Sequence, residues 1–211
     1  MGRVVRLSPT EWPKGRPFTD PGLVGRDRSV LEEMISDLYA QRGATPQLAK
    51  PKRGRDRLIV TDSGRAHGTA PVSVVGFFGQ RRPDGSPEIA EKIEQANAMM
   101  LESFAEFPML LGYVSRLLAD GFNYANLVVL AHADGIETWR DREDHVPAAT
   151  VLSRDYYSSV RIYNGAMPCG LGCWEHLRLQ LVKYWDYQED PVWQAIRHYE
   201  LLPLGAVSYT H

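Results

Sequence analysis

Several features that define large protein classes are missing from this sequence of 211 residues. It has only two cysteines, too few for the disulfide framework of a small secreted domain. No apolar run approaches the length that spans a bilayer, and the first seven residues lack the apolar core of a secretory signal. These absences predict a chain that has no membrane segment and is located in the cytoplasm.

An excess of charge of one sign is also missing. The chain has 24 Lys and Arg against 26 Asp and Glu, so its net charge is −2. No overall field attracts nucleic acid or an anionic membrane, and neither is predicted as a partner. The basic run at residues 50–57 contains no aromatic residues and is typical of a solvated linker.

Two common catalytic motifs do not occur. Gly76, Gly79 and Gly85 lack the spacing of a phosphate-binding loop, and no Gly-x-Ser-x-Gly nucleophile elbow is present. The sequence therefore gives no sign of a nucleotide-binding loop or of an esterase-type serine.

The first 57 residues are predicted to form an arm with one helix and the basic linker. Proline and glycine dominate the first 25 residues, which are typical of an irregular segment. Ser29 and Glu32 have the spacing of a capping box, which predicts a helix beginning there. One apolar face follows, made of Val30, Leu31, Met34, Ile35 and Leu38.

Residues 58–168 are predicted to form the organising domain, with the element order βαββαβ. Strands are expected at residues 72–79, 110–118, 126–131 and 157–163. Ser86 and Pro87 predict the start of the first helix, and Asp134 with Glu137 predict the start of a second. This order indicates an α+β protein with a ferredoxin-like module, whose helices cover one face of an antiparallel sheet.

Residues 169–211 are predicted to be an extension that packs on the same domain. Leu177, Leu179 and Leu181 alternate with polar residues, so at least one extra strand is expected. The extension is rich in Trp and Tyr, and so much aromatic surface requires burial. Cys169 and Cys173 are spaced unlike zinc ligands, so two buried thiols are preferred over a redox pair.

The middle of the chain resembles a known superfamily. The strand at residues 126–130, the helix with Trp139, the following His145 and the strand at residues 157–163 resemble the dimeric α+β barrel superfamily. That superfamily includes antibiotic-biosynthesis monooxygenases and haem-degrading monooxygenases. The resemblance implies a homodimer whose two sheets face each other as a barrel, with a small-molecule pocket between sheet and helices in each subunit.

The resemblance also implies roles for individual residues. His145 or His132 would remove a proton from a phenol or enol, Trp139 would stack on the substrate, and Asn126 and Arg161 would stabilise an oxyanion. Haem-degrading relatives use an Asn, a Trp and a His, and the His is the haem ligand. His145 is therefore the expected axial ligand if haem binds. The first strand, residues 72–79, contains no Asn, which counts against haem degradation.

Each of these catalytic candidates also has an ordinary structural interpretation. Trp139 lies on the same helix side as Ile136, which is typical of core packing. His145 follows a charged run, as a surface residue would. His132 could simply close a strand.

The predicted substrate-binding residues have structural interpretations as well. Arg161, Tyr157 and Tyr163 are expected to share one strand face, where they would bind an anionic or phenolic ligand or form a subunit interface. Met100 and Phe104 would line an apolar pocket or pack in a simple core.

The predicted function is therefore a small-molecule enzyme of the monooxygenase-like type, acting on an aromatic or polyketide-like substrate by proton abstraction. It would be an oxygenase, cyclase or isomerase that needs no cofactor. One alternative is a haem-binding protein or haem enzyme of the same fold. Another alternative is a stress-related dimeric binding protein without catalysis.

Overall fold

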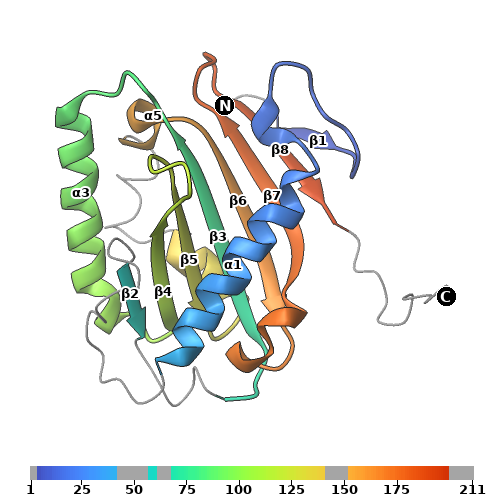
Figure 1. Cartoon of the computed structure of the whole chain (residues 1–211), viewed down its shortest axis with the longest axis vertical. Coiled ribbons are helices and arrows are strands. Elements are labelled where there is room, and N and C mark those ends of the chain that lie inside the picture. The colour runs from blue at the N-terminus through green and yellow to red at the C-terminus, as the bar shows by residue number, and fades with distance from the viewer. Residues whose placement is uncertain (1–3, 42–56, 61–67, 141–151, 200–211) are drawn as a thin grey trace.

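The computed structural model describes residues 4–41, 57–60, 68–140 and 152–199. Among these residues, the elements follow one another in the order given next, and Figure 1 shows them around a single sheet. They are β1 (Val5–Leu7), η1 (Pro17–Thr19), α1 (Leu23–Ala40), β2 (Arg57–Val60), β3 (Val72–Arg81), α3 (Pro87–Glu102), η2 (Ser103–Glu106), β4 (Leu110–Leu117), β5 (Tyr124–Leu130), α4 (Gly135–Arg140), α5 (Ser153–Tyr156), β6 (Tyr157–Met167), η4 (Leu171–His176), β7 (Arg178–Asp186) and β8 (Trp193–His198).

The sheet has the strand order β1-β8-β7-β6-β3-β5-β4-β2 in the described part of the chain. All neighbouring strands are antiparallel except β1 and β8, which are parallel. The α+β class is therefore confirmed. The four strands of the predicted module occupy the centre in the order β6-β3-β5-β4, and the predicted arm and extension each add strands to the same sheet.

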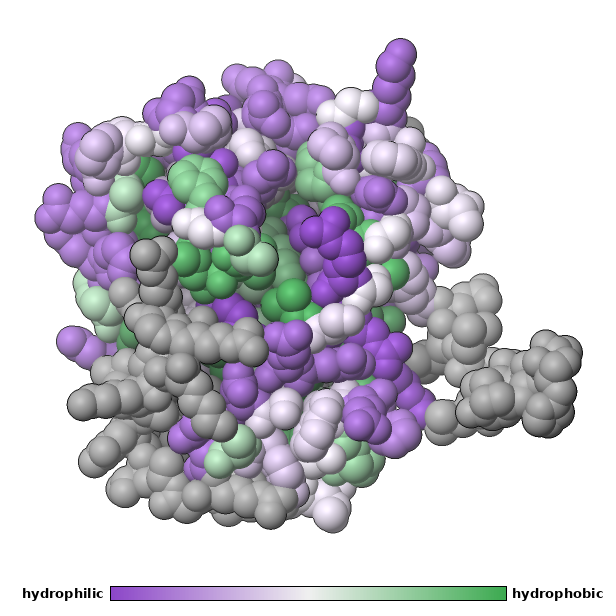
Figure 2. Space-filling model, viewed as in Figure 1, coloured by the Kyte–Doolittle hydropathy of each residue, from purple (hydrophilic) through white to green (hydrophobic). Residues whose placement is uncertain are grey.

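Helix α1 lies across one face of the sheet, in front of the strands in Figure 1. We call this the α1 face. Its stripe of Leu31, Met34, Ile35 and Leu38 is completely buried against inward side chains of β3, β4, β5 and β6. Gly76 of β3 lets the helix approach closely, because a Cβ there would lie 2.6 Å from Leu31 Cδ1. Figure 2 shows this face with hydrophobic residues visible in the middle of a largely hydrophilic surround.

The opposite face carries α3, and we call it the α3 face. Helix α3 begins as predicted, with Ser86 accepting a hydrogen bond from the Glu88 amide and Pro87 in the first turn. Met100 and Phe104 pack on Tyr113, Val128 and neighbouring sheet residues. Ile93, nearer the start of the helix, packs on a second cluster with Tyr156, Tyr157 and Val160. Figure 1 shows α3 near the β4–β2 end of the sheet, away from β7 and β8.

The start of α1 differs from the prediction. The helix begins at Leu23, six residues before Ser29, and the Ser29 hydroxyl donates to the Gly25 carbonyl instead of capping. The capping-box prediction is therefore wrong. Just before the helix, Asp20 Oδ1 accepts a hydrogen bond from the Gly22 amide and stabilises the turn that leads into α1.

Helices cover both faces of the sheet, and this arrangement differs from that of the predicted barrel. In a dimeric α+β barrel, a partner sheet packs on the face that the helices leave open. Here α1 of the same chain covers that face with fully buried side chains. The structure shows an open sheet with helices on both faces.

The N-terminal arm is tied to the last strands by one buried cation. Arg197 of β8 is completely buried and donates to the carbonyls of Ser8, Glu11 and Thr19 in the arm and to the Tyr184 hydroxyl.

Within the described residues, no helix has both the length and the apolar character needed to cross a membrane.

Candidate functional site

The predicted catalytic residues are only partly described. His145 lies outside the described residues, and so does the side chain of Trp139, whose backbone belongs to α4. His132 follows β5 and is exposed. The proton-abstraction mechanism therefore stays a prediction.

Arg161 and Tyr163 lie beneath α1 and not with the other candidates. The Arg161 guanidinium forms two hydrogen bonds with the Asp27 carboxylate, one of them of 2.8 Å, and the Tyr163 hydroxyl donates to the same carboxylate at 2.9 Å. Burial alone would lower the pKa of Arg161, but its hydrogen bonds and charge attraction to Asp27 outweigh that effect, so its pKa lies above the ordinary value. These groups satisfy one another, and they fix α1 to β6.

Tyr157 lies on the α3 face, opposite to Arg161 and Tyr163. The predicted alternation would place all three together, and that prediction is wrong. A register shift between Gln80 and Arg81 of β3 leaves Ser158 as an extra residue in β6, so the side chains before it change faces. Burial raises the pKa of the Tyr157 hydroxyl, which is enclosed by Phe77 and Tyr156.

Asn126 lies on the α3 face near the middle of β5. It shares this face with Val128, two residues along the strand, which packs in the cluster of Met100 and Phe104. The Oδ1 atom of Asn126 is buried and accepts no hydrogen bond from any of the residues that the structure describes. A buried acceptor without a partner costs about 1–3 kcal/mol, so a ligand donor is one explanation for its retention.

Direct cross-strand pairing extends a row of side chains from Asn126 across the α3 face. Pairing runs from Ser115 to Asn126, Phe77, Ile162, Lys183 and Ile196, from β4 to β8. Every member of this row, which we call the transverse row, is only partly buried. Side chains that are directly opposite on adjacent strands point to the same face, so the row is continuous.

Sequence reasoning identified Asn126 in this row but missed the rest. Phe77 and Ile162 look like ordinary core residues in the sequence, and Lys183 looks like an exposed residue of an edge strand. Only the register between β6 and β7 brings Lys183 beside Ile162.

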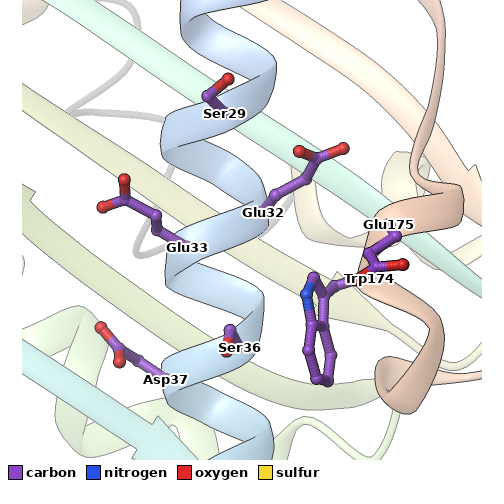
Figure 3. Close-up of a pocket in the computed structure, with 7 residues that line it drawn as sticks. All are labelled: Ser29, Glu32, Glu33, Ser36, Asp37, Trp174 and Glu175. Atoms are coloured by element: carbon purple, nitrogen blue, oxygen red, sulfur yellow. The ribbon is translucent and has the colours of Figure 1, made fainter.

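A shallow groove of about 370 Å³ lies on the other side of the molecule, between α1 and η4 (Figure 3). It is lined by Ser29, Glu32, Glu33, Ser36, Asp37, Trp174 and Glu175. Arg28 pairs with Glu32, and Arg116 pairs with Glu33 and Asp37, so three of its four carboxylates are neutralised within the chain. The groove therefore looks like a solvated seam between two packed elements.

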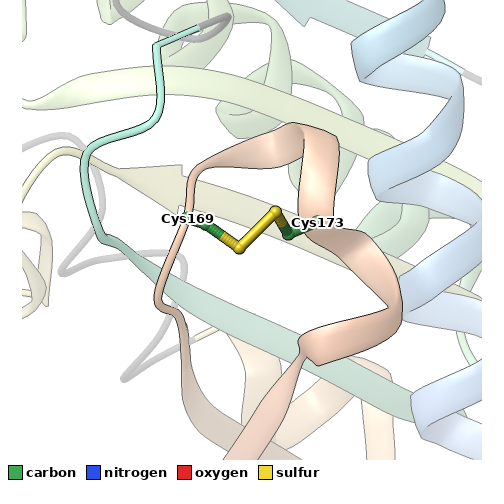
Figure 4. The surroundings of a disulfide bond; sticks show 2 residues. All are labelled: Cys169 and Cys173. Carbon is green, nitrogen blue, oxygen red and sulfur yellow. A yellow bond between two sulfur atoms is a disulfide. The ribbon is translucent and has the colours of Figure 1, made fainter.

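Cys169 lies in the loop that leads from β6 into η4, and Cys173 lies within η4, close to this seam. Cys169 and Cys173 are joined by a disulfide, so the preference for two separate thiols is wrong (Figure 4). Gly170 between them has φ +74°, and a Cβ there would lie 2.0 Å from the Gly68 carbonyl oxygen. Disulfides persist mainly in oxidising compartments, and the cytoplasmic location stays a prediction.

The fit of haem can be judged on the described histidines. His132, His176 and His198 are all exposed, so none of them provides a buried axial ligand. The one residue predicted for that role, His145, is outside the described part of the chain. The described residues do not fit haem. They also contain no group of three His, Cys, Asp or Glu side chains that could hold a metal ion.

The chain matches no family model, no curated protein and no solved structure. The case for the transverse row as a functional site therefore rests on its geometry alone.

Proposed function

We propose that the protein is a small-molecule enzyme that binds an apolar or aromatic substrate on the α3 face and acts on its hydroxyl group. The proposal rests on one observation, the buried Oδ1 of Asn126, which has no hydrogen-bond partner within the described ranges. A substrate hydroxyl would supply the missing donor. Phe77 and Ile162 beside Asn126 would supply an apolar floor.

The substrate hydroxyl belongs to a phenol or an enol. The proposed reaction begins when this hydroxyl turns from Asn126 Oδ1 to a base that takes its proton, which leaves a phenolate or enolate with an electron-rich carbon framework. His145 remains the proposed base, because imidazole titrates near neutral pH. The elements on both sides of it in the sequence pack on the α3 face: Ile136 of α4 in one cluster, and Tyr156 of α5 in the other. Rotation of the Asn126 amide would present its N–H group to the resulting oxyanion. Oxygenation, cyclisation and isomerisation can each follow from this step.

The proposal keeps the ferredoxin-like module and the homodimer but not a barrel formed across the α1 face. The order β6-β3-β5-β4 with antiparallel neighbours supports the module. Because α1 fills the other face, a homodimer would use another surface. Light scattering of the purified protein would give its mass in solution, and a monomer would contradict the dimer.

Ligand binding directly tests the proposed role of Asn126 Oδ1 as the acceptor for a substrate hydroxyl. The probes are 2-naphthol, which has a hydroxyl donor, and 2-methoxynaphthalene, which does not. We expect the protein to prefer 2-naphthol by about tenfold, which is roughly 1.4 kcal/mol. Asn126→Leu should remove this preference while retaining the binding of 2-methoxynaphthalene. An unchanged preference in the variant would contradict the proposed role of Asn126.

Catalysis is tested separately, by incubating the protein with a set of phenols and enols and identifying products by mass spectrometry. Turnover should fall at least a hundredfold in His145→Ala and stay near wild type in His132→Ala, whose side chain is exposed. Full turnover in the variant lacking both histidines would reject the mechanism. Binding without turnover of any compound would favour the non-catalytic alternative.

A further inference from the structure

The transverse row contains a second polar group that has no partner. Lys183 of β7 lies between Ile162 of β6 and Ile196 of β8, and its side chain is partly buried. Among the described residues, its ammonium group takes part in no ion pair or hydrogen bond. The aliphatic stem of Lys183 lies beside two isoleucines, and its ammonium group is available to an anion.

Lys183 and the orphan acceptor of Asn126 lie at a defined separation. Strands β3 and β6 lie between them, so three strand spacings separate the two backbones. At 4.7–4.9 Å for each spacing, the distance is about 14 Å. The residues between them in the row, Phe77 and Ile162, are apolar.

We propose that the substrate is an elongated organic anion, with an apolar body, a hydroxyl at one end and a carboxylate at the other. This inference rests on the proposed function and deepens it. The hydroxyl donates to Asn126 Oδ1, the apolar body lies over Phe77 and Ile162, and the carboxylate pairs with the Lys183 ammonium. Helix α3 lies near the β4–β2 end of the sheet, so the hydroxyl end is near the helix and the carboxylate end is away from it (Figure 1).

The charge around Lys183 supports an anion. The nearest side chains on the same face along β7 are Leu181 and Trp185, and both are uncharged. In the row beyond Ile196 stands Arg6 of β1, a second cation. No carboxylate of the described strands is directly opposite Lys183, so an incoming carboxylate meets attraction and no competing acid.

A set of four related compounds tests the two ends separately. The probes are 12-hydroxydodecanoate, its methyl ester, dodecanoate and 1,12-dodecanediol, used below their aggregation limits. Titration calorimetry of the full chain measures each affinity. We expect 12-hydroxydodecanoate to bind about tenfold more tightly than its ester and about tenfold more tightly than dodecanoate, or roughly 1.4 kcal/mol for each end.

Matched variants assign each preference to one residue. Lys183→Met should remove the preference for the acid over the ester and keep the preference for the hydroxyl, since Met retains the apolar stem. Lys183→Arg should retain both preferences. Lys92→Met is the control for loss of a lysine, because Lys92 is exposed on α3 and pairs with Glu88. Asn126→Leu should remove only the hydroxyl preference.

The outcomes separate this inference from the proposed function. An acid preference that survives in Lys183→Met overturns the inference, and the proposed function still stands if Asn126→Leu loses the hydroxyl preference. A hydroxyl preference that survives in Asn126→Leu overturns the proposed role of Asn126, whatever Lys183 does. No binding of any of the four compounds overturns the inference, and the naphthol pair then decides the proposed function.

Discussion

The two faces of this sheet are built in different ways. On the α1 face, apolar side chains are completely buried, and charged groups such as Asp27, Arg116 and Arg197 have partners within the chain. On the α3 face, the transverse row is partly exposed and contains an acceptor and a cation that have no partner in the described part of the chain. Buried charges that have partners within the chain serve stability. A face that leaves polar groups unsatisfied is the place to look for function.

The largest effect is expected from breaking the buried ion pair of the α1 face. Asp27→Ala leaves the Arg161 guanidinium buried without its carboxylate and removes the acceptor of Tyr163. Loss of one partner of a buried pair costs about 3–5 kcal/mol, and urea unfolding would measure it. The combined variant Asp27→Leu with Arg161→Met should recover most of the loss. A cost below 1 kcal/mol for Asp27→Ala would contradict the structural role of this pair.

A substitution on the α3 face should change the free energy of unfolding in the opposite direction. Asn126→Leu removes a buried acceptor that has no partner, so it should raise the free energy of unfolding by about 1 kcal/mol while it weakens the binding of hydroxyl compounds. Urea unfolding without ligand gives the first quantity. A destabilised Asn126→Leu would show that Asn126 is structural and would remove the contrast between the faces.

Alkaline pH provides a third test. Burial raises the pKa of Tyr187, on the α3 side of β7, from the usual 10.0 to about 12. The unfolded chain then releases the phenolic proton at lower pH than the folded one. The contribution of this group is therefore fully present below pH 10 and is lost as the pH rises from 10 to 12. Unfolding measured at several pH values should show a flatter decline in Tyr187→Phe, and identical declines would contradict the burial of this hydroxyl.

The smallest effect is expected at the β4–β5 turn, which belongs to neither face. Asp120 accepts hydrogen bonds from the backbone amides of Phe122 and Asn123 and from the Asn123 side chain. Burial opposes these bonds, but they prevail and lower the pKa of Asp120, so its contribution is present at neutral pH and is lost in acid as the carboxylate becomes protonated. Asp120→Ala should cost about 0.5 kcal/mol at pH 7, because the site is exposed, and nothing in strong acid.

Local signals in the sequence predicted part of this structure well. The capped start of α3 and the strands β3 to β6 follow from residues close together in the chain. The start of α1 was predicted wrongly because Ser29 and Glu32 have the spacing of a capping box but lie inside a helix that begins at Leu23.

Other parts depend on contacts that no local pattern records. The partner of Arg161 is Asp27, which is 134 residues away in the sequence. The face of Tyr157 depends on one extra residue in β6, and the placement of Lys183 depends on the register of β7. Of the predicted substrate residues, Asn126 is the one that lies in the transverse row.

The tie between the two ends of the chain has a consequence for synthesis. Strand β1 pairs with residues 195–197, and Arg197 holds the arm through backbone carbonyls. During translation, β1 therefore cannot pair with β8 until almost two hundred residues have emerged from the ribosome. Because a carbonyl makes the contact at Ser8, the exposed side chain of Ser8 is freer to change in evolution than the arginine that binds its backbone.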